Sequence, residues 1–423
     1  MLRSMFSAVS GLRGHQSMLD VIGNNLANVN TVGYKGSSTI FQDLLSQQLR
    51  GAGAPTALNA GTNPSQVGIG VRLGAITQSF TQGAAQLTNR ATDISIQGDG
   101  FFVTRSGGEF LYTRLGSFSF DQTGNLATPD GGVVQGWMAV NGVINTNQGV
   151  TDIRLPLGQI IEPVETGSIK IGGNLPSDAA AGTSITTSID VYDTQGTAIP
   201  VTFTFTKSAT ANEWTVSATA PNAGGVATAI DEYDPPVTLA FDPATGMPTS
   251  ALPAIDRATL ATSLGRTFTA GTIAVDGGTA TDPDALRQFA GSNTLAAIDQ
   301  DGRAMGFLRS FTIGGDGRIT GVFSNGTTQA LGQIALASFN NPTGLEKAGD
   351  STYRATINSG LANIGISGEG GRGTMLGGTL EMSNVDVANE FTNLIVAQRG
   401  FQANSRVITS SDELLQDLVN MKR

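Results

Sequence analysis

The sequence contains no cysteine and a single histidine, His15. Without a thiol the chain cannot form a disulfide, a zinc–thiolate site or a cysteine nucleophile. The lone histidine argues against multi-histidine metal sites and histidine-based catalytic triads. We interpret His15 as a residue that packs within a helix seam. We therefore expect no metal, no cofactor and no catalytic residue.

Charged residues are also scarce, at 14% of the chain, and acidic residues outnumber basic ones to give a net charge of −10. A protein that binds nucleic acid or an anionic membrane surface normally carries a basic patch. There is no run of 18 apolar residues, and residues 1–10 lack the apolar core of a signal peptide. We expect no nucleic-acid partner, no membrane insertion and no cleaved signal peptide.

What the sequence does have is a seven-residue apolar repeat at each end. Such a repeat keeps one face of a helix turned toward a partner helix over many turns. At the N-terminus the predicted helix is 1–30, and its apolar residues are Met5, Val9, Leu12, Leu19, Ile22, Leu26 and Val29. At the C-terminus it is 384–423, and its apolar residues are Val387, Phe391, Leu394, Phe401, Ile408, Leu415 and Val419. The two helices are predicted to form a coiled-coil-like pair.

The ends of these helices carry their own signals. Ser383 and Asp386 fit a capping box at the start of the second helix. Glycines at 11, 14 and 23 weaken the first helix, each by about 1 kcal/mol relative to alanine. We expect both helices to be marginal alone and to become ordered through further contacts.

The interior of the chain is predicted to be β-rich. Asp121–Gly124, Asp193–Gly196 and Asp299–Gly302 share the Asp-x-x-Gly pattern of β-turns, and Asn141-Gly142 is a hairpin signal. The predicted fold is therefore mainly β with α-helical termini. The domain layout that we expect is a terminal helical domain (1–30 and 384–423), a connecting segment (31–66, with a short helical turn near 41–49), a parent β domain (67–146 and 293–383) and an inserted outer β domain (147–292).

No motif in the interior indicates catalysis. The Gly-rich stretch Gly368–Gly373 lacks the Lys-Ser/Thr of a phosphate-binding loop, and Asp299–Gly302 lacks the remaining ligands of a calcium loop. The first is interpreted as a loop and the second as a hairpin turn. Trp137 and Trp214 are isolated and are interpreted as core residues.

Three stretches together resemble the flagellar axial proteins, and most closely the hook proteins of that family. They are 19–35, 67–102 and 378–404. The residues that carry the motifs are Asn24, Asn25, Asn28, Gly33, Tyr34, Lys35, Ser383, Asn384, Asp386, Gln398 and Arg399. The stretch 331–353 is also similar, so the resemblance covers both ends and the parent β domain, whereas 147–292 matches only loosely.

The resemblance implies a non-enzymatic, structural subunit that assembles with copies of itself into a short curved tube, a universal joint for motility. The terminal helices would form the inner wall of that polymer. Implied partners are the distal rod protein, the hook cap, the hook–filament junction proteins and the flagellar type III export apparatus. The implied location is the extracellular hook and basal body. Two alternatives remain, a distal-rod or hook-associated protein and, from another class, a secreted β-rich adhesin or carbohydrate-binding module.

Overall fold

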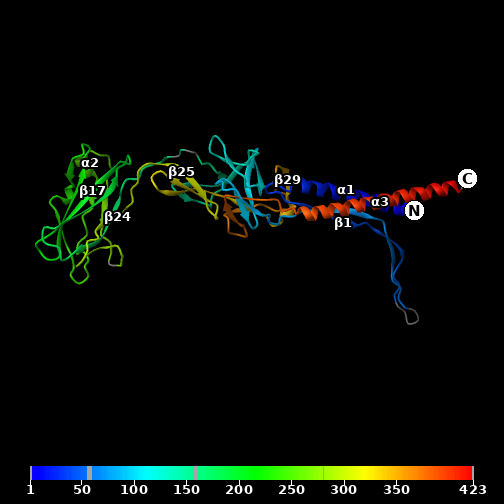
Figure 1. Cartoon of the computed structure of the whole chain (residues 1–423), viewed down its shortest axis with the longest axis horizontal. Coiled ribbons are helices and arrows are strands. Elements are labelled where there is room, and N and C mark those ends of the chain that lie inside the picture. Colours follow the sequence, from blue (N-terminus) through cyan, green and yellow to red (C-terminus); the bar gives the residue numbers. More distant parts are fainter. Residues whose placement is uncertain (1, 55–59, 156–157, 159, 280, 422–423) are drawn as a thin grey trace. The chain divides into compact units, whose positions relative to one another are not determined.

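A computed structural model describes residues 2–54, 60–155, 158, 160–279 and 281–421, except for the side chains of Leu2, Leu418 and Val419. The described chain is mainly β with three α-helices (Figure 1). It forms two compact units. Unit 1 comprises Met1–Leu157, Phe311–Gly321 and Gln329–Arg423, and unit 2 comprises Gly158–Ser310 and Val322–Thr328.

The inserted unit thus begins and ends later in the chain than the expected 147–292. Thr151–Asp152 (β13) pairs with Val133–Val140 (β11), which holds residues before 157 in unit 1. Ala296–Gln300 (β24) pairs antiparallel with Ser168–Pro176 (β15), which holds residues after 292 in unit 2. Strand pairing between distant segments sets both boundaries, and local composition gives no sign of it.

The predicted pair of terminal helices is confirmed. Leu2–Ala27 (α1) and Val387–Asn420 (α3) lie side by side and antiparallel (Figure 1). The predicted capping box is wrong, because α3 begins after Asp386. The Asp386 carboxylate accepts hydrogen bonds from the backbone N–H groups of Ala388 (2.8 Å) and Asn389 (3.4 Å), which are left without partners in the first turn of a helix. Within the described residues, no helix has the length and apolarity needed to cross a membrane.

The segment expected to be a connector with a helical turn is instead a long β-hairpin. Its strands are β1 (Ser37–Asp43), β2 (Ser46–Arg50), β3 (Ser65–Gly68) and β4 (Val71–Gln78). β1 pairs with β4 and β2 pairs with β3, both antiparallel. β1 and β4 lie against α1, and the β2–β3 part continues away from the helices (Figure 1). Cross-strand hydrogen bonds satisfy the backbone here, so no helical turn forms near 41–49.

The main sheet of unit 1 runs in the order β27-β11-β7-β8-β30-β29. Its further strands are β7 (Phe101–Ser106), β8 (Glu109–Thr113), β27 (Thr328–Ile334), β29 (Glu346–Gly349) and β30 (Thr352–Arg354). Shorter strands around it are β9 (Ser119–Phe120), β10 (Leu126–Ala127), β12 (Val143–Ile144), β28 (Leu336–Ser338) and β31 (Asn363–Gly365). Asn141-Gly142 forms the expected hairpin turn between β11 and β12. An aromatic core lies beneath the sheet, with Phe101 between Phe80, Phe339 and Tyr353 at ring-centroid distances of 5.4–5.8 Å.

Two short ribbons connect this core to the helices. β5 (Ala85–Leu87) pairs with β33 (Thr379–Glu381), and β6 (Ile94–Gln97) pairs with β32 (Thr374–Gly377). Each ribbon joins a segment that follows α1 to a segment that precedes α3. The segment that follows α1 and the segment that precedes α3 are therefore held together by strand pairing next to the helix pair.

Unit 2 has two sheets around one apolar core. The first sheet has the order β21-β22-β15-β23, with β24 also on β15, and the second has the order β16-β17-β18-β19, with β20 also on β18. The further elements are β16 (Ser184–Tyr192), β17 (Ala198–Lys207), β18 (Glu213–Pro221), β19 (Ala227–Ala229), β20 (Val237–Ala240), β21 (Ile255–Asp256), α2 (Arg257–Leu264), β22 (Thr272–Asp276) and β23 (Leu286–Phe289). Val201, Phe203 and Phe205 alternate along β17 with threonines and are fully buried, as an apolar–polar alternation predicts. A short strand, β14 (Ile160–Ile161), pairs with β25 (Gly306–Ile313), and the chain passes between the units through β25 and β26 (Arg318–Phe323).

Candidate assembly site

Where α1 and α3 come closest, a glycine of one helix lies opposite a larger polar side chain of the other. Gly11 lies opposite Asn404, and a Cβ added to Gly11 would come within 2.8 Å of the Asn404 side chain. Gly400 lies opposite His15 in the same way, at 2.5 Å from the imidazole ring. His15 is thus a helix-packing residue, as expected. Gly11 and Gly400 let the two backbones come close at these points, although each glycine weakens its own isolated helix.

The face of α3 that α1 covers also differs from the predicted seam. Its most buried residues are Ala397 and Ser411, which are 0% and 7% exposed, with Asn404 half-buried between them. The polar members are satisfied within their own helix, because Asn404 donates to the carbonyl of Gly400 (2.9 Å) and Ser411 to that of Val407 (2.7 Å). Asn404 and Ser411 are therefore paired within α3, whereas Nδ1 of His15 on the opposite helix is buried without a hydrogen-bond partner.

The predicted seam residues of α1 all face inward to some degree. Ile22 is buried, and the others are half-buried: Met5, Val9, Leu12, Leu19, Leu26 and, just after the helix, Val29. In α3 only Leu394, Ile408 and Leu415 are half-buried. Val387, Phe391 and Phe401 remain 38–49% exposed. The side chain of Val419 lies outside the described residues. One edge of the predicted α3 stripe is therefore left uncovered in the single chain.

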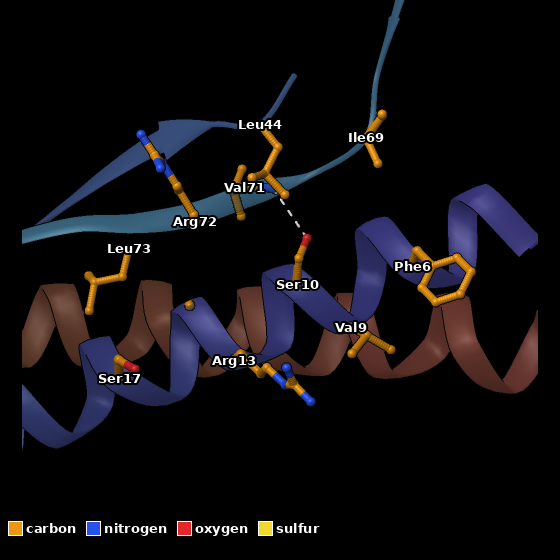
Figure 2. A pocket seen from close by; sticks show the side chains of 11 residues that line it. Phe6, Val9, Ser10, Arg13, Ser17, Leu44, Ile69, Val71, Arg72 and Leu73 are labelled. Carbon is orange, nitrogen blue, oxygen red and sulfur yellow. Dashed lines mark hydrogen bonds between the residues drawn. The ribbon is translucent and has the colours of Figure 1, made fainter. Parts of the chain in front are cut away.

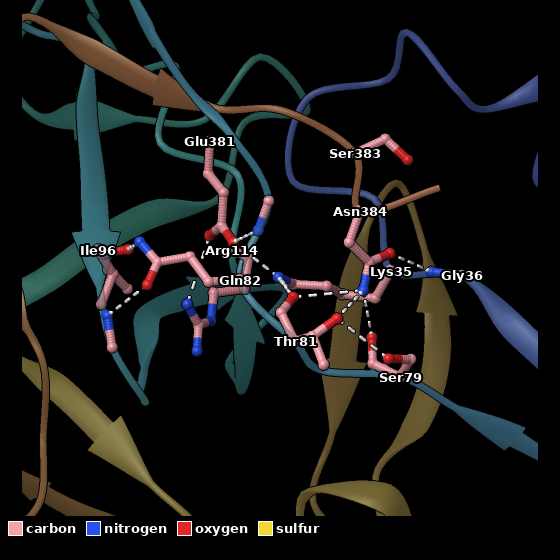
Figure 3. A network of polar contacts seen from close by, with 12 residues as sticks. Lys35, Gly36, Ser79, Thr81, Gln82, Ile96, Arg114, Glu381, Ser383 and Asn384 are labelled. Atoms are coloured by element: carbon pink, nitrogen blue, oxygen red, sulfur yellow. Dashed lines mark hydrogen bonds and ion pairs between the residues drawn. The ribbon is translucent and has the colours of Figure 1, made fainter. Parts of the chain in front are cut away.

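A buried charge cluster lies where the helices meet the β ribbons (Figure 3). The Lys35 ammonium contacts Glu381 Oε1 at 2.7 Å, and Arg114 contacts Glu381 Oε2 at 3.3 Å. All three side chains are at most 2% exposed. Lys35 also donates to the carbonyl of Thr81 (2.7 Å). Burial lowers the pKa of Lys35, while the neighbouring Glu381 carboxylate acts in the opposite direction. The guanidinium of Arg114 also lies 5.3 Å from the centroid of Phe101, which ties the cluster to the aromatic core.

Asn384 joins the two ends of the chain beside this cluster (Figure 3). Its side-chain oxygen accepts from the backbone N–H of Gly36 (2.8 Å), and its side-chain nitrogen donates to the carbonyls of Ser79 (2.8 Å) and Thr81 (3.2 Å). One amide group thus fixes the segment after α1, the end of the hairpin and the segment before α3. Its neighbour Ser383 lies in the extended segment.

Asn25 makes a second connection between the helices. This buried side chain donates to the carbonyl of Ser37 (2.7 Å) and to Glu390 (3.2 Å), and it accepts from the hydroxyl of Tyr34 (3.2 Å). Burial raises the pKa of Glu390, and Asp386 raises it further, whereas the hydrogen bond from Asn25 lowers it. Burial and the Glu390 carboxylate raise the pKa of Tyr34. A carboxyl group is thus held in a partly buried position at the base of the helix pair.

The remaining residues of the N-terminal motif shape the turn after α1. Asn28 donates to both the carbonyl and the side-chain oxygen of Asn24 (3.0 and 2.8 Å), which caps the last turn. Gly33 has a φ of 68°, and a Cβ at this position would lie 2.9 Å from the backbone of Arg114. Only glycine combines this conformation with this close approach.

The structure thus brings most of the motif residues to one junction, but not all. Gln398 and Arg399 lie on the exposed face of α3, away from the cluster. Sequence reasoning missed Arg114, Glu381 and Glu390. The one signal for the Lys35 cluster was a lysine within a motif of small and polar residues, since a buried lysine needs a partner charge, but it did not say which residue that partner is.

The arrangement offers no reactive centre among the described residues. They include no group of three or more His, Cys, Asp or Glu side chains placed to hold a metal ion. The cluster instead joins the segment after α1 to the segment before α3 through buried ion pairs. It lies beside a helix pair that carries exposed apolar side chains.

Comparison with known protein families gives four matches, which together cover both ends and most of the interior. They are the flagella basal body rod protein (5–35), the flagellar hook protein FlgE/F/G D1 domain (95–174), the flagellar basal body protein FlaE D2 domain (170–303) and the flagellar basal body rod FlgEFG protein C-terminal (376–421). These matches define the class as the flagellar rod and hook axial proteins.

Individual relatives narrow the class. The flagellar hook proteins FlgE of Borreliella burgdorferi and Treponema pallidum are 39% and 40% identical, each aligned over 100% of both chains. The flagellar basal-body rod protein FlgG of Bacillus subtilis is 32% identical, also over 100% of both chains. The crystal structure of the Helicobacter pylori flagellar hook protein FlgE2 has a similar fold, with a TM-score of 0.52 at 16% identity, over 69% of this chain and 98% of that one. The chain belongs to the flagellar hook protein family.

Proposed function

We propose that this chain is the structural subunit of a bacterial flagellar hook, which assembles with copies of itself into a short curved tube. That tube joins the rod to the filament and acts as a universal joint that transmits torque. Family membership over the full chain supports the proposal, and so does the fold. The role is mechanical, and no residue is assigned to catalysis.

The observation that carries the proposal is the uncovered apolar side of α3. Phe391, Ile395, Val396 and Leu414 are 49–57% exposed although each is a large apolar residue. A helix pair that stood alone in water would not expose so many of them. Neighbouring copies in the wall of a tube would cover them, and each fully buried side chain contributes about 1.5–3 kcal/mol. The self-assembly residues of α1 and α3 named above thus serve two contacts, one within the chain and one between chains.

The same features support the finer expectations about export and partners. Helices that are weak in isolation can pass through the flagellar type III export apparatus unfolded, without a cleaved signal peptide, and become ordered on assembly. The ends of such a tube would meet the distal rod protein on one side, and the hook cap and hook–filament junction proteins on the other. The subunit would then reside in the extracellular hook and basal body.

Unit 2 is suited to the outer surface of a tube that bends. The outward positions of β16 and β17 are mostly threonine and serine, and the chain as a whole carries few charges. Neighbouring surfaces of this kind make few strong ion pairs, so they can shift as the tube curves. Large apolar interfaces between units 2 of adjacent subunits would contradict this role.

The alternative within the class is a rod subunit. The Bacillus subtilis relative that is named a rod protein covers the whole chain, including the inserted unit. The insertion therefore does not separate hook from rod by itself, and the higher identity to hook proteins favours the hook. Negative-stain electron microscopy of the purified chain under salting-out conditions distinguishes them. Curved tubes support the hook, straight tubes support the rod, and monomers at every concentration contradict both.

A further inference from the structure

A groove runs between α1 and the β1–β4 hairpin (Figure 2). It has a volume of about 490 Å³ and an apolar floor. The apolar lining residues are Phe6, Val9, Leu44, Ile69, Val71 and Leu73. Phe6 is 62% exposed, and Ile69 is 42% exposed. The two walls of the groove are joined by a hydrogen bond, because the N–H of Val71 donates to the hydroxyl of Ser10 (3.2 Å).

The C-terminal end of α3 exposes apolar side chains, which is what an apolar groove needs in an occupant. Gly11 lies opposite Asn404 and His15 opposite Gly400, so in this antiparallel register Leu2 is level with Glu413. The part of α3 from Leu414 onward therefore extends past the first residue of α1. Leu414 and Met421 in this extension are 55% and 83% exposed. They are seven residues apart, and Met421, which directly follows α3, continues its last turn through a hydrogen bond from its N–H to the carbonyl of Asp417 (2.9 Å), so both lie on one side of the extension.

Charge also matches between the two surfaces. Arg13 and Arg72 line the groove, and none of its lining residues is acidic. The α3 extension carries one acidic residue, Asp417; Asp412 and Glu413 directly precede it, and Lys422 and Arg423 follow it. Asp417 falls between Leu414 and Met421 on the same helical face. The extension thus carries an apolar–acidic–apolar stripe. The groove has the complementary composition, apolar with two arginines in its lining.

The chain cannot fill its own groove with this stripe. The groove follows residues 6–17 of α1, which lie level with the middle of α3, whereas the extension points away beyond the N-terminus of α1. The occupant must come from another molecule.

We propose that the α3 extension, residues 414–421, docks into the α1–β4 groove of a second copy of this chain. Leu414 and Met421 are the apolar anchors, and Asp417 pairs with Arg13 or Arg72. Because the groove and the extension are different surfaces of one subunit, the contact is heterologous and repeats from copy to copy, as a helical tube requires. This inference rests on the proposed self-assembly and names one of its interfaces.

The absence of cysteine makes a direct test possible. Val71→Cys and Leu414→Cys are made in separate full-length chains, mixed, assembled and oxidised, so that any disulfide joins two molecules. The inference predicts a cross-linked dimer in tubes from this mixture. Ile395→Cys mixed with Val71→Cys is the matched control, because Ile395 is equally exposed on α3 but lies outside the extension. Tubes that give no cross-link, or that cross-link equally with the control, overturn the inference while leaving the proposed function intact.

A charge exchange tests the same contact independently. Asp417→Arg should raise the concentration needed for assembly by about tenfold, equivalent to about 1.4 kcal/mol. Arg13→Glu with Arg72→Glu should do the same, and combining all three substitutions should restore assembly. Failure of the combined variant to recover contradicts the contact. If the unmodified chain forms no polymer under any condition, the proposed function fails, and this inference fails with it.

Discussion

Lys35 shows how a single residue can join the two ends of a chain. It lies eight residues after α1, yet its partner Glu381 precedes α3, and the two side chains are buried together with Arg114. A buried ion pair of this kind adds little net stability compared with apolar packing, but removal of one member leaves the other charge unpaired. Its effect is to specify one geometry at the junction. Asn25 and Asn384 act in the same way with neutral amide groups.

Replacement of Lys35 by methionine tests this role. Lys35→Met removes the 2.7 Å partner of Glu381 Oε1, while Arg114 and the N–H of Gly83 still contact the carboxylate, and we expect a loss of about 1–3 kcal/mol in the free energy of unfolding. Urea denaturation of the full chain measures it. Arg354→Met is the control, because the Arg354–Glu109 pair is exposed and should be worth at most about 1 kcal/mol. Equal losses in the two variants would contradict a junction role.

The partly buried Glu390 predicts a dependence of stability on pH. Its pKa in the folded state lies above the ordinary value of 4.5. The stabilising contribution of the bound proton is fully present below pH 4.5 and is lost as the pH rises through the raised pKa. Glu390→Gln should therefore be at least as stable as the unmodified chain near neutral pH, and the two should converge below pH 4.5. Hydrogen exchange of the helices across this interval measures the difference. Glu413→Gln, at an exposed position in the same helix, is the control for removal of a carboxylate from α3.

At the scale of elements, the periodicity of apolar residues predicted the helices and the alternating strands. It did not predict strands and side chains whose partners lie far away in the sequence. Both terminal helices and the alternating strand β17 follow from their apolar spacing. The β1–β4 hairpin did not, because most of its residues are exposed on both faces and show no alternation. Its strands are defined by pairing with distant residues, from Arg50 with Ser65 at the tip to Ser37 with Gln78 at the base. The same limit hid Arg114 and Glu381, since no local pattern reveals a partner hundreds of residues distant. The small-residue contact between α1 and α3 was missed because glycine was interpreted only as a helix breaker.

Two glycines in α1 distinguish these interpretations. Gly11 faces Asn404 closely, whereas a Cβ at Gly23 would meet nothing within 4 Å. Gly11→Leu should force the helices apart at a cost of about 1–3 kcal/mol. Gly23→Leu should stabilise α1 by up to about 1 kcal/mol through helix propensity. Amide hydrogen exchange in α1 and α3 reports both effects, and a similar response to the two substitutions would contradict the close contact.

For the whole molecule, the chain divides into two units, and every residue that we propose for assembly lies in unit 1. Each unit has its own core and its own tryptophan, Trp137 in unit 1 and Trp214 in unit 2, and both are buried. The terminal helices α1 and α3 and the Lys35–Arg114–Glu381 cluster belong entirely to unit 1. We expect unit 2 to tolerate change without loss of self-assembly.

The two tryptophans allow the units to be followed separately. Phe203 is fully buried in the core of unit 2, and Phe203→Ala should cost about 3–5 kcal/mol. In a Trp137→Phe background the fluorescence of Trp214 should report this loss. In a Trp214→Phe background the transition reported by Trp137 should stay within about 0.5 kcal/mol. A matching shift of both transitions would show that the units unfold as one.

The central claim is that the terminal helices drive assembly, because some of their apolar side chains are left uncovered in the single chain. The most direct test compares the full-length chain with a variant lacking residues 1–30 and 384–423, by electron microscopy and sedimentation under the same salting-out conditions. We predict curved tubes from the full-length chain and folded monomers from the truncated one. Tubes from the truncated chain would contradict the account, because assembly would then reside in the β units.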